Sequence, residues 1–501
     1  MKIALVNPNL NSSMAAIPHG LLSIASTVRH AGFSCDLFDQ NVQNVTVETL
    51  KKYDVVGFSA MTAQLKAAVP LADQLATHCK IVWGGIHALL DPSSLLNRYP
   101  ESQVILGEGE YPLVNLLQSF AKGEEKPDGL PGVMRLDQGT ATPATPFMID
   151  DLDTLPDADY GLLPQIEKYI VTEDTFTRRI SRRLTILTGR GCVWNCSFCI
   201  HSVFHRMHHR PRKKSITKIK RECEGWVRDL KIDILDPSDD DFFGDQNLVR
   251  DWCQFARDTG FRWAGNCRFN YFGDKFITPA FLREMQQSGC YALFMSIEAG
   301  DEKTRNRILH KGVKDKDIER TIRIIHESGV DMAVGTSFIT HFPGDSPQNR
   351  IATIKMMDSL SRRLNIIFSG PQVYRAYPGS RLYDLDPSTR SDLTMDDYLR
   401  FTGDEHFFSS MNSQVSQHEE NFFSRGLIGL FNCRFRFLEH AGTPENSWKR
   451  KLICRWLIRI LFLPVLLRLR FDYWKFFIEY RLIGWIISVG KNYGAKVNNK
   501  A

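Results

Sequence analysis

The sequence predicts an α/β protein: an N-terminal Rossmann-like domain, a partial (β/α)6 barrel, and a C-terminal region that is mainly helical. Short apolar runs alternate with helical patterns over residues 1–140 and again over 181–390, as in parallel sheets. Residues 141–180 are rich in Pro and Asp and predict a connector. From Trp448 onward the chain is aromatic, apolar and basic, which predicts a helical C-terminal region over 391–501.

In the first domain, the predicted strands are short apolar runs that end in turn residues. They cover 2–6, 33–38, 54–59, 80–83 and 104–106, with helices expected over about 20–31 and 67–78. Ligands of such sheets bind beyond the carboxyl ends of the strands. No Gly-x-Gly-x-x-Gly follows the first strand, so a dinucleotide is disfavoured.

The second domain repeats the alternation. Strands are expected over 183–187, 232–235, 262–268, 293–297, 332–339 and 366–369, with helices over 219–230, 281–287 and 318–328. Active residues of such a barrel lie at the carboxyl ends of its strands.

Three cysteines follow the first of these strands in Gly-Arg-Gly-Cys-Val-Trp-Asn-Cys-Ser-Phe-Cys: Cys192, Cys196 and Cys199. Thiolates at these offsets can hold three corners of a 4Fe-4S cluster and leave one iron open for another ligand. A structural zinc site would want a closed set of four ligands, for which His201 or His205 is available, so zinc stays an alternative, as do cysteines that bind no metal. The odd total of eleven cysteines argues against a complete disulfide framework.

With Phe198, the triad resembles the Cys-x-x-x-Cys-x-aromatic-Cys hallmark of radical S-adenosylmethionine (SAM) enzymes, and the resemblance covers 181–390. It implies a 4Fe-4S cluster with SAM at its open iron. It also implies that Phe198 packs beside the adenine of SAM and that Asp239 and Asp240 lie near its amino group. Arg268 and Glu298 would lie where that family contacts the carboxylate and ribose of SAM. By residue type alone, the acidic run at 239–241 is also typical of a helix N-cap or a solvated turn. Glu298 is likewise typical of a salt-bridged residue at a strand end. Lys311-Gly312 and Pro378-Gly379 also match the subfamily with cobalamin domains.

Four pieces of the N-terminal domain resemble, in order and spacing, the cobalamin-binding domain of that subfamily: 17–22, 57–62, 84–87 and 107–110. The resemblance implies cobalamin contacts from Ser59, Thr62, Gly84, Gly85, His87, Gly107 and Glu108. The Asp-x-His-x-x-Gly motif is absent from the loop at 7–14, so cobalamin is expected without an axial His, with an upper face that can carry a methyl group. For His19 and His87, hydrogen bonding or packing is favoured over a cofactor contact. Loss of cobalamin binding stays an alternative.

The net charge of +6 is unevenly distributed. Residues 449–501 hold twelve Lys or Arg against two Asp or Glu, so this stretch carries +10 and the remainder −4. The main body therefore predicts no broad surface for nucleic acid. A basic segment such as 205–214 is most often a solvated loop, although its charge also suits binding to phosphate, a carboxylate or an anionic lipid. The tail at 449–490 predicts either a helical cap on the barrel, which is favoured, or peripheral membrane contact.

The N-terminus begins as a strand and not as a secretory signal, so a cytoplasmic protein is expected, with possible association at the membrane surface. Together these features predict a cobalamin-dependent radical SAM enzyme that methylates an unactivated carbon through a 5′-deoxyadenosyl radical and methylcobalamin. A flavodoxin or ferredoxin would supply electrons, and the substrate would be a small molecule or lipid.

Two alternatives remain. One is an oxidative cyclase or ring-rearranging enzyme on a tetrapyrrole-like or lipid substrate, because anaerobic magnesium-protoporphyrin ester cyclases share this architecture. The other is an iron–sulfur and cobalamin sensor, which would not need the SAM-contact elements.

Overall fold

The computed structural model describes residues 1–10, 15–177, 179–207, 210–374, 379–385 and 393–401, and single residues at 423, 427, 428, 431, 432, 467 and 471. The chain divides into two compact units. The first contains 1–193, 203–263 and 390–407, and the second contains 194–202, 264–389 and 408–501. The units therefore do not follow the predicted domain boundaries, because the predicted barrel contributes to both.

A seven-stranded sheet begins the first unit, in the order β2-β1-β3-β4-β5-β6-β7. Its strands are β1 Lys2–Asn7, β2 Ser34–Asp39, β3 Val55–Ser59, β4 Lys80–Gly84, β5 Gln103–Ile105, β6 Val133–Asp137 and β7 Thr140–Ala141. The first five strands are parallel, and β6 and β7 are antiparallel. Ile3, Leu5 and Val6 in β1 are completely or almost completely buried, as expected of a parallel strand that is covered on both faces.

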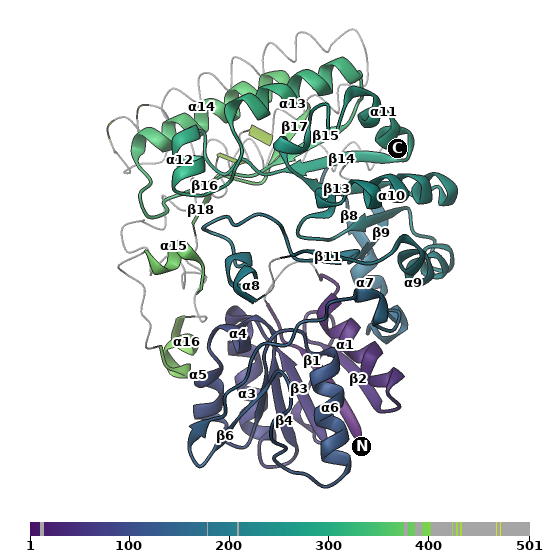
Figure 1. Ribbon diagram of the computed structural model, residues 1–501, viewed down its shortest axis with the longest axis vertical. Helices are drawn as coiled ribbons and strands as arrows, with labels where there is room; N and C mark the ends of the chain where they lie inside the picture. Colours follow the sequence, from purple (N-terminus) through teal and green to yellow (C-terminus); the bar gives the residue numbers. More distant parts are fainter. Residues whose placement is uncertain are drawn as a thin grey trace, which may run out of the picture. The chain divides into compact units, whose positions relative to one another are not determined.

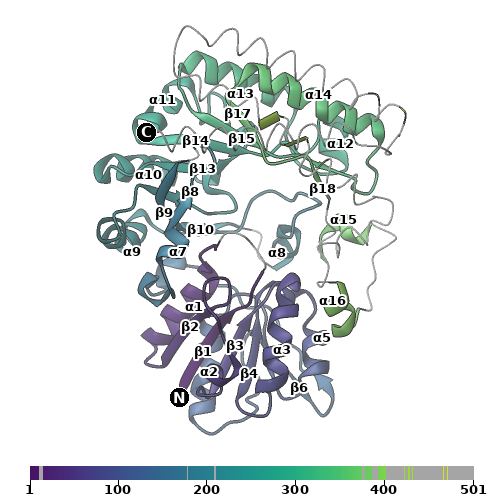
Figure 2. The same ribbon diagram turned by 180° about the vertical axis from the view of Figure 1, so that it is seen from behind.

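Helices cover both faces of this sheet (Figure 1 and Figure 2). They are α1 His19–His30, α2 Val47–Leu50, α3 Leu65–Leu75, α4 Gly85–Leu90, α5 Pro92–Arg98 and α6 Glu110–Ala121. Helices α1 and α6 pack together, and so do α2 and α3. The crossovers from β1 to β2 and from β3 to β4 run in opposite directions, so right-handed connections place α1 and α3 on opposite faces. The strand order reverses between β1 and β3, where such sheets form their ligand crevice.

The same unit holds the start of the barrel. Strands β8 Val171–Glu173, β9 Ile180–Ile186 and β12 Ile234–Pro237 form a sheet in the order β12-β9-β8, in which β9 and β12 are parallel. Strands β10 Gly189–Arg190 and β11 Arg212–Lys213 pair antiparallel. Further helices of this unit are α7 Glu167–Ile170, α9 Ile216–Asp229, α10 Gln246–Thr259 and α16 Met395–Phe401, and it also contains α8 His201–Met207 from residue 203 onward. The expected connector is a packed segment, because Ile149, Leu152 and Leu155 form a buried apolar cluster.

Local sequence sets the ends of these helices. Asp245 caps α10 by accepting hydrogen bonds from the backbone N–H groups of Asn247 and Leu248. Gly260 ends the helix in the left-handed conformation, which glycine adopts without steric cost. The buried face of α10 carries Trp252, whose ring packs edge-on against Phe242 and Trp263.

The second unit contains a four-stranded sheet in the order β13-β14-β15-β17. Its strands are β13 Trp263–Cys267, β14 Cys290–Met295, β15 Ala333–Thr336 and β17 Ile366–Phe368, and β16 Ile339–Thr340 pairs with β18 Gln372–Val373. Its helices are α11 Pro279–Gln287, α12 Glu302–Arg307, α13 Asp315–Ser328, α14 Pro347–Arg363 and α15 Arg381–Asp384. The six strands expected for the barrel are therefore present, as β9 and β12 in the first unit and β13, β14, β15 and β17 in the second.

A piece of the C-terminal region covers the outer strand β17. The side-chain amide of Asn432 accepts a hydrogen bond from the backbone N–H of Phe368 at 2.8 Å and donates one to its carbonyl at 2.7 Å. Phe423, Leu427 and Phe431 are buried at helical spacing. These contacts satisfy backbone groups that an exposed strand edge would leave open.

Candidate functional site

The loop of the three cysteines is inserted between β10 and β11. It runs from the first unit, which contains Cys192, into the second, which contains Cys196 and Cys199. In the second unit, Ser197 anchors it: the backbone N–H donates to the Leu309 carbonyl at 3.1 Å and the hydroxyl to the Ile308 carbonyl at 2.6 Å. A tight turn follows, in which the Cys199 N–H donates to the Cys196 carbonyl at 3.1 Å.

Arg268 lies next to one of these thiols. Its Nη1 is 3.9 Å from Cys196 Sγ, and its guanidinium stacks over the Trp194 ring at 3.9 Å from the ring centre. Nη2 donates to the backbone carbonyl of Lys311, and the side chain is almost completely buried. Its position therefore places a fixed positive charge beside Cys196. The predicted contact of Arg268 with the SAM carboxylate stays a prediction.

A buried ion pair occupies the carboxyl end of β14. Glu298 Oε1 lies 2.9 Å from Lys311 Nζ, and both side chains are 7% exposed. Lys311 also faces the Phe198 ring, at 5.8 Å from its centre. Glu298 has φ +75°, a left-handed conformation that side chains rarely adopt and that is frequent at functional sites. The salt-bridged strand end considered for Glu298 is therefore present, and it brings Phe198 and Glu298 around Lys311.

The residues of the acidic run at 239–241, after β12, differ in burial and in their partners. Asp239 is buried and accepts hydrogen bonds from the N–H and hydroxyl of Thr188, at 2.7 and 2.6 Å, and from Lys213 Nζ at 2.8 Å. It thus ties the end of β9 to β11, whereas Asp240 is exposed. Neither the helix cap nor the solvated turn describes Asp239, because its carboxylate is an internal anchor. Next to it, Asp241 Oδ2 is 3.9 Å from Cys192 Sγ.

At the carboxyl ends of β3 and β4, the predicted cobalamin contacts lie together. Gly85 has φ +86°, and a Cβ there would lie 2.8 Å from the backbone nitrogen of Ala60. The Ala60 N–H donates to the Gly84 carbonyl at 3.1 Å, and the His87 N–H donates to the Ala60 carbonyl at 3.0 Å. These bonds hold the loops after Ser59 and Gly84 in close contact.

His87 is buried within the first unit. Its Nδ1 is 3.1 Å from the Thr62 hydroxyl, and its Nε2 is 3.1 Å from the Ser94 hydroxyl. Burial lowers the pKa of His87 to about 4, against a smaller opposing effect of Asp91. His87 is therefore a neutral hydrogen-bonding residue, as favoured, and both its ring nitrogens already have partners.

Gly107 and Glu108 connect the turn after β5 to other segments of the first unit. Gly107 has φ +87° and packs against the backbone of Phe147, to whose carbonyl the Glu108 N–H donates at 2.8 Å. The Glu108 carboxylate lies 3.1 Å from Arg190 and 2.8 Å from Arg212. Burial raises the pKa of Glu108, but the two arginines and a backbone hydrogen bond from Ile149 outweigh it, so the pKa lies below its usual value.

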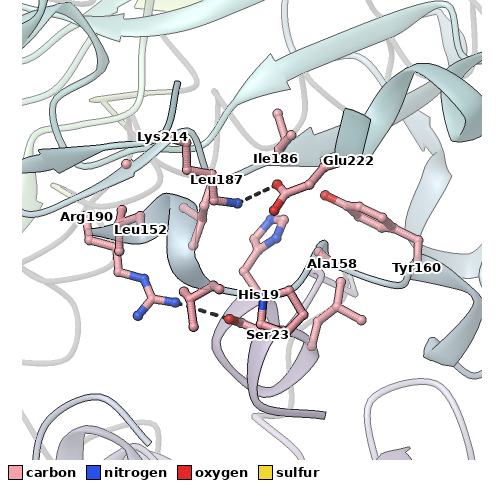
Figure 3. Close-up of a pocket in the computed structure, with 14 residues that line it drawn as sticks. His19, Ser23, Leu152, Ala158, Tyr160, Ile186, Leu187, Arg190, Lys214 and Glu222 are labelled. Atoms are coloured by element: carbon pink, nitrogen blue, oxygen red, sulfur yellow. Dashed lines mark hydrogen bonds and ion pairs between the residues drawn. The ribbon is translucent and has the colours of Figure 1, made fainter. Parts of the chain in front are cut away.

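A small cavity is lined in part by Gly189 and Arg190 of β10 (Figure 3). Its volume is about 20 Å³, and its polar lining includes His19, Tyr160, Lys214 and Glu222. Such a space holds about one water molecule and no cofactor. Burial, with a smaller effect from Lys214, lowers the pKa of His19 to about 3, and its Nε2 lies 2.9 Å from the Thr185 hydroxyl. His19, like His87, has a hydrogen-bonding role.

Comparisons with known proteins identify two domains in this chain. Residues 10–117 match the profile of the B12 binding domain, and residues 186–357 match that of the radical SAM superfamily. The chain is a radical SAM protein with a B12 binding domain. It is 26% identical over 414 residues to an uncharacterized methyltransferase of Pyrococcus horikoshii, covering 79% of this chain and 85% of that protein. It is 24% identical over 408 residues to the anaerobic magnesium-protoporphyrin IX monomethyl ester cyclase of Rubrivivax gelatinosus, covering 76% of this chain and 69% of the cyclase.

The fold is shared with a solved radical SAM enzyme. The methyltransferase TsrM of Kitasatospora setae, with cobalamin and a [4Fe-4S] cluster bound, has a TM-score of 0.59 at 17% identity, covering 91% of this chain and 89% of TsrM. The predicted fold class and cofactor set of this radical SAM protein, a 4Fe-4S cluster, SAM and cobalamin, are thus confirmed at the level of its domains.

The donors of this radical SAM protein fit these groups chemically. Thiols in one loop beside the buried Arg268 suit an anionic iron–sulfur cluster. Gly84 leaves open space where a Cβ would stand, and Leu10 and Met61 expose apolar side chains in the loops after β1 and β3, as an edge that receives a large macrocycle would. Within the described ranges, no three His, Cys, Asp or Glu side chains are grouped at metal-ligand spacing. The cysteine triad and the individual cofactor contacts therefore stay predictions.

Some predictions about this radical SAM protein need correction or lie outside the described residues. The basic segment is not simply a solvated loop, because Arg212, Lys213 and Lys214 form ion pairs with Glu108, Asp239 and Glu222. Pro378 is not described, and of the tail at 449–490 only Leu467 and Phe471 are described. In the portion of the chain that the structure describes, no helix is both long and apolar enough to cross a membrane.

Sequence reasoning gave no role to Lys311, Arg190 or Trp194. Lys311 could have been found from the match of Lys311-Gly312 to the subfamily with cobalamin domains. Arg190 could have been found because it stands two residues before Cys192. Trp194 stands inside the cysteine motif at a position that the motif leaves open.

Proposed function

We propose that this protein methylates an unactivated carbon of a small-molecule substrate, using cobalamin as the methyl carrier. The observation that supports this most is the presence of a B12 binding domain and a radical SAM domain in one chain. Similarity to a methyltransferase over 79% of the chain adds support. When bound, the three groups supply one-electron cleavage of SAM, removal of hydrogen from carbon, and a methyl group on cobalt.

The residues of the chain then bind and orient. Cys192, Cys196 and Cys199 would hold the cluster, and Arg268 would offset the negative charge of its thiolates. Lys311 fixes the Glu298 carboxylate at the carboxyl end of β14 and faces Phe198, where we place the ribose and adenine of SAM. His87 would support the cobalamin loop without ligating cobalt, because hydroxyl groups occupy both ring nitrogens.

We also propose the domain division 1–140, 141–180, 181–390 and 391–501 as the functional division of the chain. The first part would hold cobalamin, and the third would hold the cluster and SAM. A flavodoxin or ferredoxin would supply the electron, and the tail at 449–490 would contact a membrane surface if the substrate is a lipid. Reduced iron–sulfur chemistry suits the cytoplasm.

Anaerobic reconstitution with iron, sulfide and cobalamin tests the proposal. The loaded protein is incubated with SAM that carries a deuterated methyl group, a strong reductant and a small-molecule extract of the native host. Methyl transfer should yield deuterated methylcobalamin, S-adenosylhomocysteine, 5′-deoxyadenosine and a product with a labelled carbon-bound methyl group. Cys196→Ala should lose the cluster iron and 5′-deoxyadenosine, and Cys253→Ala, distant in sequence and buried in α10, serves as the matched control.

Oxidative cyclisation is the second candidate, supported by similarity to a cyclase over 76% of the chain. It consumes SAM only as a hydrogen acceptor, so it yields 5′-deoxyadenosine without S-adenosylhomocysteine. That pattern, with no label in any carbon-bound methyl group, would replace the methyl-transfer proposal with cyclisation.

A further inference from the structure

Two carboxylates of the B12 binding domain reach the strands that flank the cysteine loop. Glu108 Oε1 lies 3.1 Å from Arg190 Nη1, and Glu108 Oε2 lies 2.8 Å from Arg212 Nη1. Glu110 Oε1 lies 2.5 Å from Arg190 Nη2. Positive and negative side chains thus alternate: Arg190 lies between the two carboxylates, and Arg212 lies beside Glu108.

Burial makes these contacts strong. The Glu110 side chain is 2% exposed, Arg212 is 9% and Glu108 is 11% exposed. Charges screened this little attract more strongly than surface pairs, and the geometry of a paired guanidinium and carboxylate is directional. Ser23 adds to the network, because its hydroxyl donates to Glu110 at 2.7 Å. The same hydroxyl accepts a hydrogen bond from Arg190 at 3.3 Å (Figure 3).

The backbone that carries both carboxylates is also fixed. The left-handed Gly107 sits against Phe147, and the Ile149 N–H donates to Glu108 at 2.7 Å. The turn after β5 is therefore a rigid support.

Arg190 and Arg212 stand opposite each other in the β10–β11 pair. They mark the two ends of the insert at 191–211, in which Cys192 follows Arg190 by two residues. Two guanidinium groups at facing positions would repel each other without the carboxylates between them. Loss of one carboxylate should therefore loosen both ends of the insert.

We propose that Glu108 and Glu110 are positioning residues that fix the cysteine loop to the turn after β5, and so set the separation between the iron–sulfur cluster and cobalt. The link to methyl transfer rests on the proposed function, whereas the link to cluster position does not. Misplacement of a reacting group by about 1 Å reduces a rate on the order of 10²-fold.

Glu110→Gln tests the proposal in the full-length, reconstituted protein, with Glu108→Gln as a second variant. Glu101→Gln is the control, because Glu101 pairs with Lys126 on the surface of the same domain. The first readout is electron paramagnetic resonance of protein that holds reduced cluster and cob(II)alamin, whose spin–spin splitting depends on their separation. The second is the rate of 5′-deoxyadenosine formation from SAM with dithionite.

We expect both Gln variants to retain iron, cobalamin and a folded far-ultraviolet spectrum. Their spin–spin splitting should change, and SAM cleavage should fall on the order of 10²-fold, while Glu101→Gln matches wild type. Wild-type splitting and cleavage in either folded variant would overturn the proposal. If wild type makes no methylated product but the splitting still shifts, the proposed function fails and the positioning role stands.

Discussion

Replacement of Lys311 by Met tests the central buried ion pair of the second unit. The change removes the ammonium group 2.9 Å from Glu298 and keeps most of the side-chain volume. Both side chains are 7% exposed, so water cannot replace the lost partner. Removal of one partner from a buried pair costs about 3–5 kcal/mol, because the other charge stays buried and unpaired. This is roughly a 10²- to 10⁴-fold drop in the folding equilibrium constant. Urea unfolding of Lys311→Met at neutral pH, followed by circular dichroism, measures this loss of stability.

The double variant Lys311→Met/Glu298→Gln should recover much of the stability, because no buried charge remains. Glu319→Gln is the control, since Glu319 pairs with Arg363 on the surface, where a pair contributes about 0–1 kcal/mol. If Lys311→Met is as stable as Glu319→Gln at neutral pH, or if the double variant is less stable than both single variants, the argument from burial is wrong.

Further outcomes follow from other buried groups. The His87 pKa of about 4 lies below its usual 6.5, so the unfolded chain binds the proton first as pH falls. Stability should therefore drop by about 3 kcal/mol from pH 6.5 to 4, and His87→Gln should flatten that slope in urea titrations. Asp239→Asn should lower the melting temperature, because it removes the buried partner of Lys213; an unchanged transition would contradict its anchoring role. Gly85→Ala should reduce the cobalamin retained on gel filtration, whereas Gly123→Ala, with φ +88° but open space, should retain it; equal retention would refute the close approach.

Periodicity predicted the order of the strands because parallel strands are continuous apolar runs. The run at 54–59 became β3, and the run at 80–83 became β4. Helices α10 and α14 were not among the predicted elements, because charged residues interrupt their apolar positions and only one face is buried. Their caps at Asp245 and Ser346 were the local signals that could have identified them.

In the candidate site, too, the local features were predictable from the sequence and the long-range contacts were not. The spacing of Cys192, Cys196 and Cys199 is local and was visible in the sequence. The partners of Glu108 and Asp239 were not visible, because Arg190, Arg212 and Lys213 lie tens of residues away and approach them only through sheet pairing. In the structure both carboxylates pair with cations of the chain, and their predicted cofactor contacts stay predictions.

By itself, the sequence determined the fold class and the set of cofactors that this chain is expected to use. Donor type and spacing within one loop predict a thiolate site, and missing motifs disfavour a dinucleotide and an axial His on cobalt, because such features depend only on neighbouring residues. Only the tertiary structure decided which charges neutralise one another and which histidines are already hydrogen-bonded. Those assignments depend on distances across strands that are far apart in the chain, and on burial, which makes an unpaired charge too costly to keep.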